Sequence, residues 1–158
     1  MGTVRHSLGD ALMSTGEPKY RILVVEDEAM VNMLLEDMVL DCGCEIIGPV
    51  AKFDRALEVA REEEFDVAVL DLNLGGTLSY PIAEVIRARG IPVIFATGYG
   101  AAGLLDKFRD CPTLQKPFSL SDFAQSVMVA CDLSQAMDRR PHPRSRAGAD
   151  QPPLPARP

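Results

Sequence analysis

The feature that most constrains the fold is an alternation of short apolar runs with amphipathic stretches between residues 20 and 134. Short apolar runs are typical of buried strands, whereas apolar residues at i, i+4 and i+8 are typical of helices. Their alternation predicts a parallel sheet that helices cover on both faces. The expected strands span residues 20–25, 45–50, 65–70, 91–96 and 113–115, and the expected helices span 28–41, 54–64, 80–89 and a stretch that begins at 119.

Two of these elements carry specific boundary signals. Gly48-Pro49 is expected to end the second strand, and Ser119 with Asp122 has capping-box spacing, which predicts the start of the last helix. We expect this last helix to bury Phe123, Val127 and Cys131. We likewise expect the helix over 28–41 to bury Met30, Met33 and Met38.

The segment between the fourth and fifth strands is a poor helix candidate. Gly98, Gly100 and Gly103 crowd the first half of residues 98–112, and each glycine costs about 1 kcal/mol in a helix relative to alanine. A fourth helix is therefore expected to be short, over 104–109 at best, or mobile.

The chain of 158 residues fits one domain. We expect a flexible leader over 1–18, a folded domain over 19–137 and a disordered tail over 138–158, where prolines and arginines gather. No apolar segment predicts a secretory signal or a membrane span, so the expected location is cytoplasmic, with no membrane partner. Four cysteines without paired zinc-site spacing are expected to be reduced, and Cys42-Gly-Cys44 is expected to pack in the core.

The folded part of the chain is acidic. The net charge is −7, and residues 20–134 carry 9 Lys and Arg against 19 Asp and Glu. Binding to nucleic acid requires a basic face that meets the phosphates. The charge balance therefore argues against nucleic acid as the main partner.

Polar residues gather where the expected strands end. Glu26 and Asp27 follow the first strand, Asp71 the third, Thr97 the fourth and Lys116 the fifth. In parallel α/β sheets, ligands bind outside the carboxyl ends of the strands. A carboxylate inside the apolar run would cost several kcal/mol, so we expect Asp71 to open into such a crevice.

The chemistry of this group is consistent with phosphoryl transfer. Carboxylates at close range raise one another's pKa unless a cation compensates them, and Mg²⁺ prefers oxygen ligands. A carboxylate can also attack phosphorus and form an aspartyl phosphate. Phosphoryl transfer needs mainly positioning and charge neutralisation, which a metal ion, an ammonium and a hydroxyl can supply.

Taken singly, each motif has an ordinary structural explanation, such as helix capping by Glu26-Asp27. Together and in this order, the residues at the strand ends resemble the receiver domain of bacterial two-component response regulators over about residues 20–134. The resemblance implies a doubly wound five-stranded parallel sheet of flavodoxin-like order 2-1-3-4-5. It also implies a phosphoacceptor at Asp71.

The resemblance assigns the metal and phosphoryl ligands as well. Asp27 and Asp71 would bind Mg²⁺ directly, Glu26 through water, and Asn73 through its backbone carbonyl. The phosphoryl oxygens would be bound by Thr97 and Lys116, with a cis bond between Lys116 and Pro117.

One departure from the family concerns its switch aromatic. Receivers usually carry Tyr or Phe three residues before the lysine, where this chain has Thr113. The run Phe-Ala-Thr-Gly-Tyr, residues 95–99, resembles a subset of receivers that work with a particular class of histidine kinases in stress signalling. Two interpretations of Tyr99 stay open: it replaces the missing switch aromatic, or it is a surface tyrosine of a loop.

The resemblance implies a single-domain response regulator rather than an enzyme. Its phosphodonor would be a histidine kinase, and it would either bind a downstream protein when phosphorylated or drain phosphate as a sink. One alternative is a phosphatase like the haloacid dehalogenases, but these need a second Asp where this chain has Asn73. The other is a nucleotide-binding module, but no glycine-rich phosphate loop follows the first strand.

Overall fold

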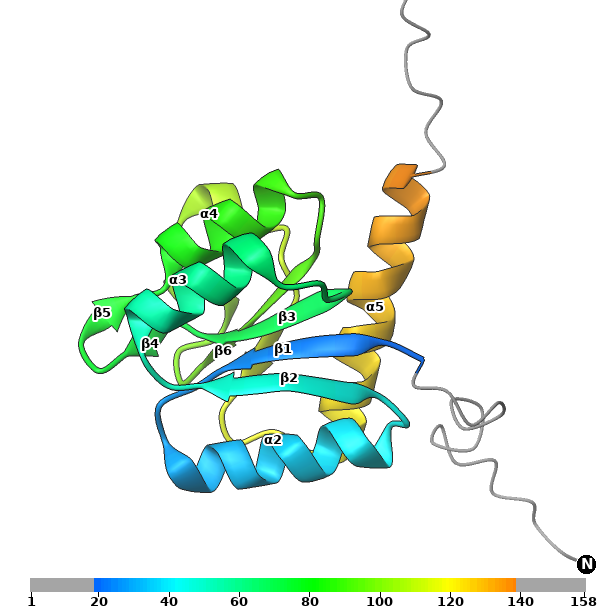
Figure 1. The fold of residues 1–158 in the computed structure, drawn as a ribbon, viewed down its shortest axis with the longest axis horizontal. Helices are drawn as coiled ribbons and strands as arrows, with labels where there is room; N and C mark the ends of the chain where they lie inside the picture. Colours follow the sequence, from blue (N-terminus) through cyan, green and yellow to red (C-terminus); the bar gives the residue numbers. More distant parts are fainter. Residues whose placement is uncertain (1–18, 139–158) are drawn as a thin grey trace, which may run out of the picture.

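The computed structural model describes residues 19–138, which form a sheet between two layers of helices (Figure 1). Five parallel strands lie in the order β2-β1-β3-β6-β7, which confirms the flavodoxin-like order. They are β1 (Arg21–Val25), β2 (Glu45–Val50), β3 (Val67–Asp71), β6 (Val93–Thr97) and β7 (Thr113–Gln115). The expected leader, and the expected tail beyond Asp138, lie outside the described residues.

The helices cover the two faces of the sheet in pairs. They are α2 (Ala29–Asp41), α3 (Phe53–Glu62), α4 (Tyr80–Ala88) and α5 (Leu120–Asp138). On β1, Ile22 and Val24 pack into the core with α2 and α5, whereas Leu23 and Val25 pack into the core with α3 and α4. Because successive strand side chains point to opposite faces, a sheet covered on both faces needs continuous apolar runs. Among the helices over residues 19–138, none has the length and apolar character that crossing a membrane requires.

The expectation for the methionines of α2 was wrong at two positions. Met38 is buried, but Met30 is 85% exposed and Met33 is 68% exposed. The side of α2 that faces the sheet carries Leu35, Met38 and Val39. Met30 and Met33 lie away from that side, because burial on a surface helix follows the angular position of a residue and not its type alone.

The start of the last helix is confirmed. Asp122 N–H donates to Ser119 Oγ (3.1 Å), and Ser119 N–H donates to Asp122 Oδ2 (3.0 Å), which is a reciprocal capping box. The residues expected inward, Phe123, Val127 and Cys131, are all buried. Cys42 and Cys44 are buried free thiols of the same core cluster.

The second strand spans Glu45–Val50, the bounds that the sequence predicted, but Gly48-Pro49 lies within the strand and does not end it. The Gly48–Pro49 bond is cis, Gly48 has φ +99°, and the pairing with β1 shifts register between Leu23 and Val25. A Cβ on Gly48 would lie 2.9 Å from Val24 O and from Val50 N. Glycine therefore lets the strand pass the irregularity and resume pairing.

A hairpin that was not expected follows β3. It consists of β4 (Asn73–Leu74) and β5 (Thr77–Leu78), which pair antiparallel and project at the left in Figure 1. The turn is Gly75-Gly76, with φ of +57° and +93°. A two-residue Gly-Gly turn is a hairpin signal that could have been recognised in the sequence.

Between β6 and β7, the described chain forms no α-helix. Two 3₁₀ turns, η1 (Ala101–Gly103) and η2 (Asp106–Phe108), take the place of the expected helix over 104–109. The glycines thus disfavour an α-helix here, as predicted, but the segment forms two short 3₁₀ turns and not the short α-helix that was expected.

Candidate functional site

The predicted site residues meet at one edge of the sheet. Strands β1, β3, β6 and β7 are consecutive neighbours, so the residues at their carboxyl ends converge. Carboxylate oxygens of Glu26, Asp27 and Asp71 all lie within 4.8 Å of one another. The structure therefore brings together the three acids that the sequence singled out.

Lys116 is the cation that faces these acids. Its Nζ lies 2.8 Å from Glu26 Oε2 and 3.5 Å from Asp71 Oδ2. It also lies 3.8 Å from Glu28 Oε1, an acid that sequence reasoning did not include in the site. Burial lowers the pKa of Lys116, but its hydrogen bond with Glu26 and the surrounding carboxylates outweigh burial and raise the pKa above its ordinary value.

Asp71 is the most perturbed group of the site. It is 6% exposed, and its Oδ1 accepts a hydrogen bond from Asn73 N–H (3.2 Å). Burial and the charge of Glu26 raise the pKa of Asp71 to about 7, although Lys116 and the Asn73 N–H act in the opposite direction. Its carboxylate thus lies in an environment with more negative than positive charge.

Glu26 is fixed by contacts that the sequence did not reveal. It is fully buried, and its Oε1 accepts from Glu28 N–H (3.1 Å). Asn32 Nδ2 donates to the Glu26 carbonyl oxygen (2.9 Å), which ties α2 to the end of β1. The sequence did not indicate this role of Asn32, because a side-chain bond to a backbone oxygen six positions earlier leaves no sequence pattern.

The acids suit a hard divalent cation. The three clustered carboxylates face the ammonium of Lys116 at this edge of the sheet, and burial together with the charge of Glu26 raises the pKa of Asp71. Mg²⁺ binds such oxygen ligands and keeps several waters. Asn73 begins β4 directly beyond Asp71, and its side chain Oδ1 accepts from Gly76 N–H (2.7 Å). The side chain is therefore occupied by the hairpin turn, which is consistent with a ligand role for the backbone only.

Thr97 ends β6, the strand beside that of Asp71, and Tyr99 follows it in the loop. Thr97 is 3% exposed and its Oγ1 accepts from Tyr99 N–H (3.1 Å), whereas the Tyr99 side chain is 85% exposed. Thr97 pairs with Gln115 across β6 and β7, so its hydroxyl and Lys116 come from adjacent strand ends. The Lys116–Pro117 bond is cis, the geometry that the resemblance implies.

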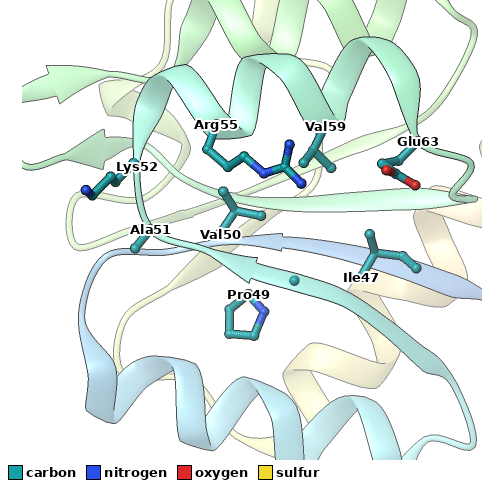
Figure 2. A pocket seen from close by; sticks show the side chains of 9 residues that line it. Ile47, Pro49, Val50, Ala51, Lys52, Arg55, Val59 and Glu63 are labelled. Carbon is teal, nitrogen blue, oxygen red and sulfur yellow. The ribbon is translucent and has the colours of Figure 1, made fainter.

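A different pocket lies between β2 and α3, at the edge of the sheet. It has a volume of about 390 Å³ and an apolar floor that includes Ile47, Val50 and Val59 (Figure 2). Arg55 on its rim pairs with Glu58 at 2.6 Å. None of the residues at the carboxylate edge lines this pocket, so it is separate from the candidate site.

The residues that build this edge of the sheet lie within the part of the chain that matches a family model. The model, described as response regulator receiver domain, matches residues 22–128. The chain belongs to this family.

A curated protein is also similar in sequence to this chain. The transcriptional regulatory protein PdtaR of Mycobacterium tuberculosis is 30% identical over 114 residues, which cover 70% of this chain and 56% of PdtaR. This receiver chain thus spans little more than half the length of that curated relative.

Solved structures similar to this chain include SdrG and PhyR. SdrG from Sphingomonas melonis Fr1 is 40% identical with a TM-score of 0.64, and the match covers 70% of this chain and 94% of SdrG. The response regulator PhyR from Brucella abortus is 27% identical with a TM-score of 0.67, over 77% of this chain and 51% of PhyR.

Proposed function

We propose that this receiver is a phosphorylation-controlled switch that takes a phosphoryl group from a histidine kinase onto Asp71. The observation that carries the proposal is the environment of Asp71. This carboxylate is nearly buried at the end of β3, within 3.5 Å of Lys116 Nζ and beside two further acids. A lone structural aspartate would not need this arrangement, whereas phosphoryl transfer needs a positioned nucleophile with compensating charge.

The transfer forms one bond and breaks another. An oxygen of the Asp71 carboxylate attacks phosphorus, the O–P bond forms, and the P–N bond to the donor histidine breaks, leaving the imidazole with the electron pair. Asn73 N–H holds the other side of the carboxylate. Lys116 moves from Glu26 toward the phosphoryl oxygens, and Thr97 donates its hydroxyl to one of them. A Mg²⁺ ion held by Asp27, Asp71, Glu26 through water and the Asn73 carbonyl would neutralise charge on the phosphoryl group.

We propose slow hydrolysis of the acyl phosphate and no enzymatic turnover. A phosphatase that uses an aspartyl phosphate needs a general acid close to the nucleophile. The residue two positions after Asp71 is Asn73, whose side chain oxygen is engaged by Gly76 N–H. This contact supports a role as phosphoacceptor over a role as phosphatase.

The exposed apolar side of α2 supports a protein as the phosphodonor. Met30, Met33, Leu34 and Leu40 are exposed by 85%, 68%, 45% and 60%. Helix α2 begins directly beyond Glu26-Asp27, and Glu28 reaches Lys116. A small phosphodonor would gain nothing from this surface, whereas a kinase that delivers phosphate to Asp71 could bury it.

We further propose that the chain acts in stress signalling, through phosphorylation-dependent binding of a downstream protein or as a phosphate sink. The support is the Phe-Ala-Thr-Gly-Tyr run over 95–99, which resembles receivers that work in stress signalling. A match described as the BeF3-activated conformation of SdrG is 38% identical, with a TM-score of 0.62. The same compound is therefore a useful probe here.

The test is intact-mass spectrometry after incubation with acetyl phosphate and Mg²⁺. Wild type should gain one phosphoryl adduct, and the adduct should be absent from Asp71→Asn and from wild type loaded in EDTA. An adduct that persists in Asp71→Asn would contradict the assignment of the nucleophile. If acetyl phosphate gives no adduct, binding of beryllofluoride in the presence of Mg²⁺ is measured by titration calorimetry, because this reversible complex does not survive intact-mass measurement. A protein that reacts with neither contradicts the proposal.

A further inference from the structure

The second half of the segment between β6 and β7 is firmly attached to α4. Phe108 is 2% exposed and stacks on Tyr80 with ring centroids 5.0 Å apart and an interplanar angle of 16°. The Arg87 guanidinium lies 5.5 Å from the centre of the Phe108 ring and donates to Lys107 O (2.8 Å). It also pairs with Asp110. These contacts fix the chain around η2.

The first half of the segment has far fewer attachments. Between residues 98 and 105, Leu104 is the buried side chain, and the others are exposed or half-buried. The Tyr80 hydroxyl makes two hydrogen bonds to this part: it accepts from Leu105 N–H (3.0 Å) and donates to Gly103 O (3.4 Å). Tyr80 itself is 8% exposed and packs edge-on against Phe95, so its ring is fixed.

Residues 98–105 are also connected to Thr97. Gly103 lies against Tyr99: a Cβ on Gly103 would be 3.3 Å from Tyr99 Cβ. The Tyr99 backbone N–H in turn donates to Thr97 Oγ1. A chain of contacts therefore runs from the Tyr80 hydroxyl through residues 103–105 and Tyr99 to the hydroxyl of Thr97.

We propose that the Tyr80 hydroxyl is a positioning group that holds residues 98–105, and through them Thr97, in the unphosphorylated arrangement. The inference rests on the proposed function, because Thr97 has to turn its hydroxyl to the phosphoryl group on Asp71. That turn gives up the bond from Tyr99 N–H and draws residues 98–105 away from Tyr80. The two bonds of Tyr80 thus stabilise the resting state against the phosphorylated one.

Two variants test these bonds: one removes both, and the other removes only the bond from Leu105 N–H. Tyr80→Phe deletes the hydroxyl and keeps the ring that packs on Phe95 and Phe108. Leu105→Pro deletes the donor N–H and leaves Tyr80 intact. Leu105 has φ −59° and Leu104 has φ −81° and ψ 148°, which are values that proline and the residue before it readily adopt. Tyr20→Phe, at a half-buried tyrosine outside this segment, is the matched control.

The first measurement is amide hydrogen exchange at Leu105 in the unliganded protein. Tyr80→Phe should accelerate it by about tenfold, the change expected when one hydrogen bond of roughly 1.4 kcal/mol is lost, and Tyr20→Phe should leave it unchanged. Equal exchange in wild type and Tyr80→Phe would overturn the proposal. This comparison involves no phosphoryl group, so it stands independently of the proposed function.

The second measurement is the apparent affinity for beryllofluoride with saturating Mg²⁺. Tyr80→Phe and Leu105→Pro should each bind beryllofluoride more tightly than wild type, without a change in Mg²⁺ affinity. The double variant should gain no more than Tyr80→Phe, because that variant already lacks both bonds. Binding of beryllofluoride should also accelerate exchange at Leu105 in wild type. Unchanged affinity in both variants would overturn the coupling to Thr97. If wild type binds no beryllofluoride, the proposed function and the coupling fail together, while the exchange comparison still decides whether Tyr80 holds the segment.

Discussion

At the scale of single residues, the environment of Asp71 has a consequence for stability. Its pKa is raised to about 7 in the folded protein, against 3.8 for the ordinary carboxyl group. A carboxyl group with a raised pKa stabilises the fold most when it is protonated, so its contribution is present at low pH and is lost as the pH rises through about 7. Without metal, Asp71 therefore opposes folding in alkaline solution.

We predict that Asp71→Asn stabilises the protein increasingly with pH in EDTA. The free energy of unfolding of Asp71→Asn minus that of wild type should rise by about 2 kcal/mol between pH 5.5 and 8.5. The reason is that wild type loses stability over this interval as Asp71 gives up its proton. Urea denaturation at several pH values measures the difference. Asp54→Asn, which removes an exposed acid of α3, controls for the loss of one charge, and a pH-independent difference for Asp71→Asn would contradict the raised pKa.

The pairing of Lys116 with the buried Glu26 supports a second prediction. Lys116→Met leaves the carboxylate of Glu26 without its cation and should cost about 3 kcal/mol at neutral pH in EDTA. Adding Glu26→Gln should recover most of that loss, because the buried charge is then gone. Lys52→Met, at an exposed lysine, is the control. If the double variant is less stable than Lys116→Met, the pair is not what stabilises this edge.

At the scale of elements, the capping box of α5 can be tested alone. Ser119→Ala removes the acceptor for Asp122 N–H and should lower the free energy of unfolding by about 1 kcal/mol. Ser121→Ala, at an exposed serine of the same first turn, should change it much less. Calorimetry or urea denaturation measures both, and equal effects would show that the cap contributes nothing of its own.

The elements also show what the sequence could and could not predict. Strand β3 was predicted over 65–70 and is found at Val67–Asp71, because a buried parallel strand is a short apolar run between polar segments. The bounds of β2 were predicted, whereas the exposure of Met30 and the register shift between β1 and β2 were missed, because both depend on how an element packs against its neighbours. The aromatic contact between Tyr80 and Phe108 joins residues whose proximity no local pattern encodes.

At the scale of the whole molecule, the site could be predicted because the order of the strands in the sheet brings its residues together. Glu26 and Lys116 are 90 positions apart, yet they form a 2.8 Å ion pair. Their proximity follows from the sequence, because each residue comes directly after a strand and parallel strands end at the same edge of the sheet. Distances, the participation of Glu28 and the bond from Asn32 required the structure, because they depend on side chain conformations.

The same edge should couple Mg²⁺ binding to the stability of the entire domain. A ligand that binds only the folded state stabilises it by about 2.7 kcal/mol at one hundred times its Kd, which is roughly a 10 °C rise in Tm for a domain of this size. At pH 6 the rise should be smaller than at pH 8, because protons compete with the ion for Asp71, whose pKa is about 7. Thermal unfolding with increasing Mg²⁺ at both pH values measures this. Asp27→Asn removes one of the three clustered acids and should lose most of the rise, and an equal rise in that variant would mean that the ion binds somewhere else on the molecule.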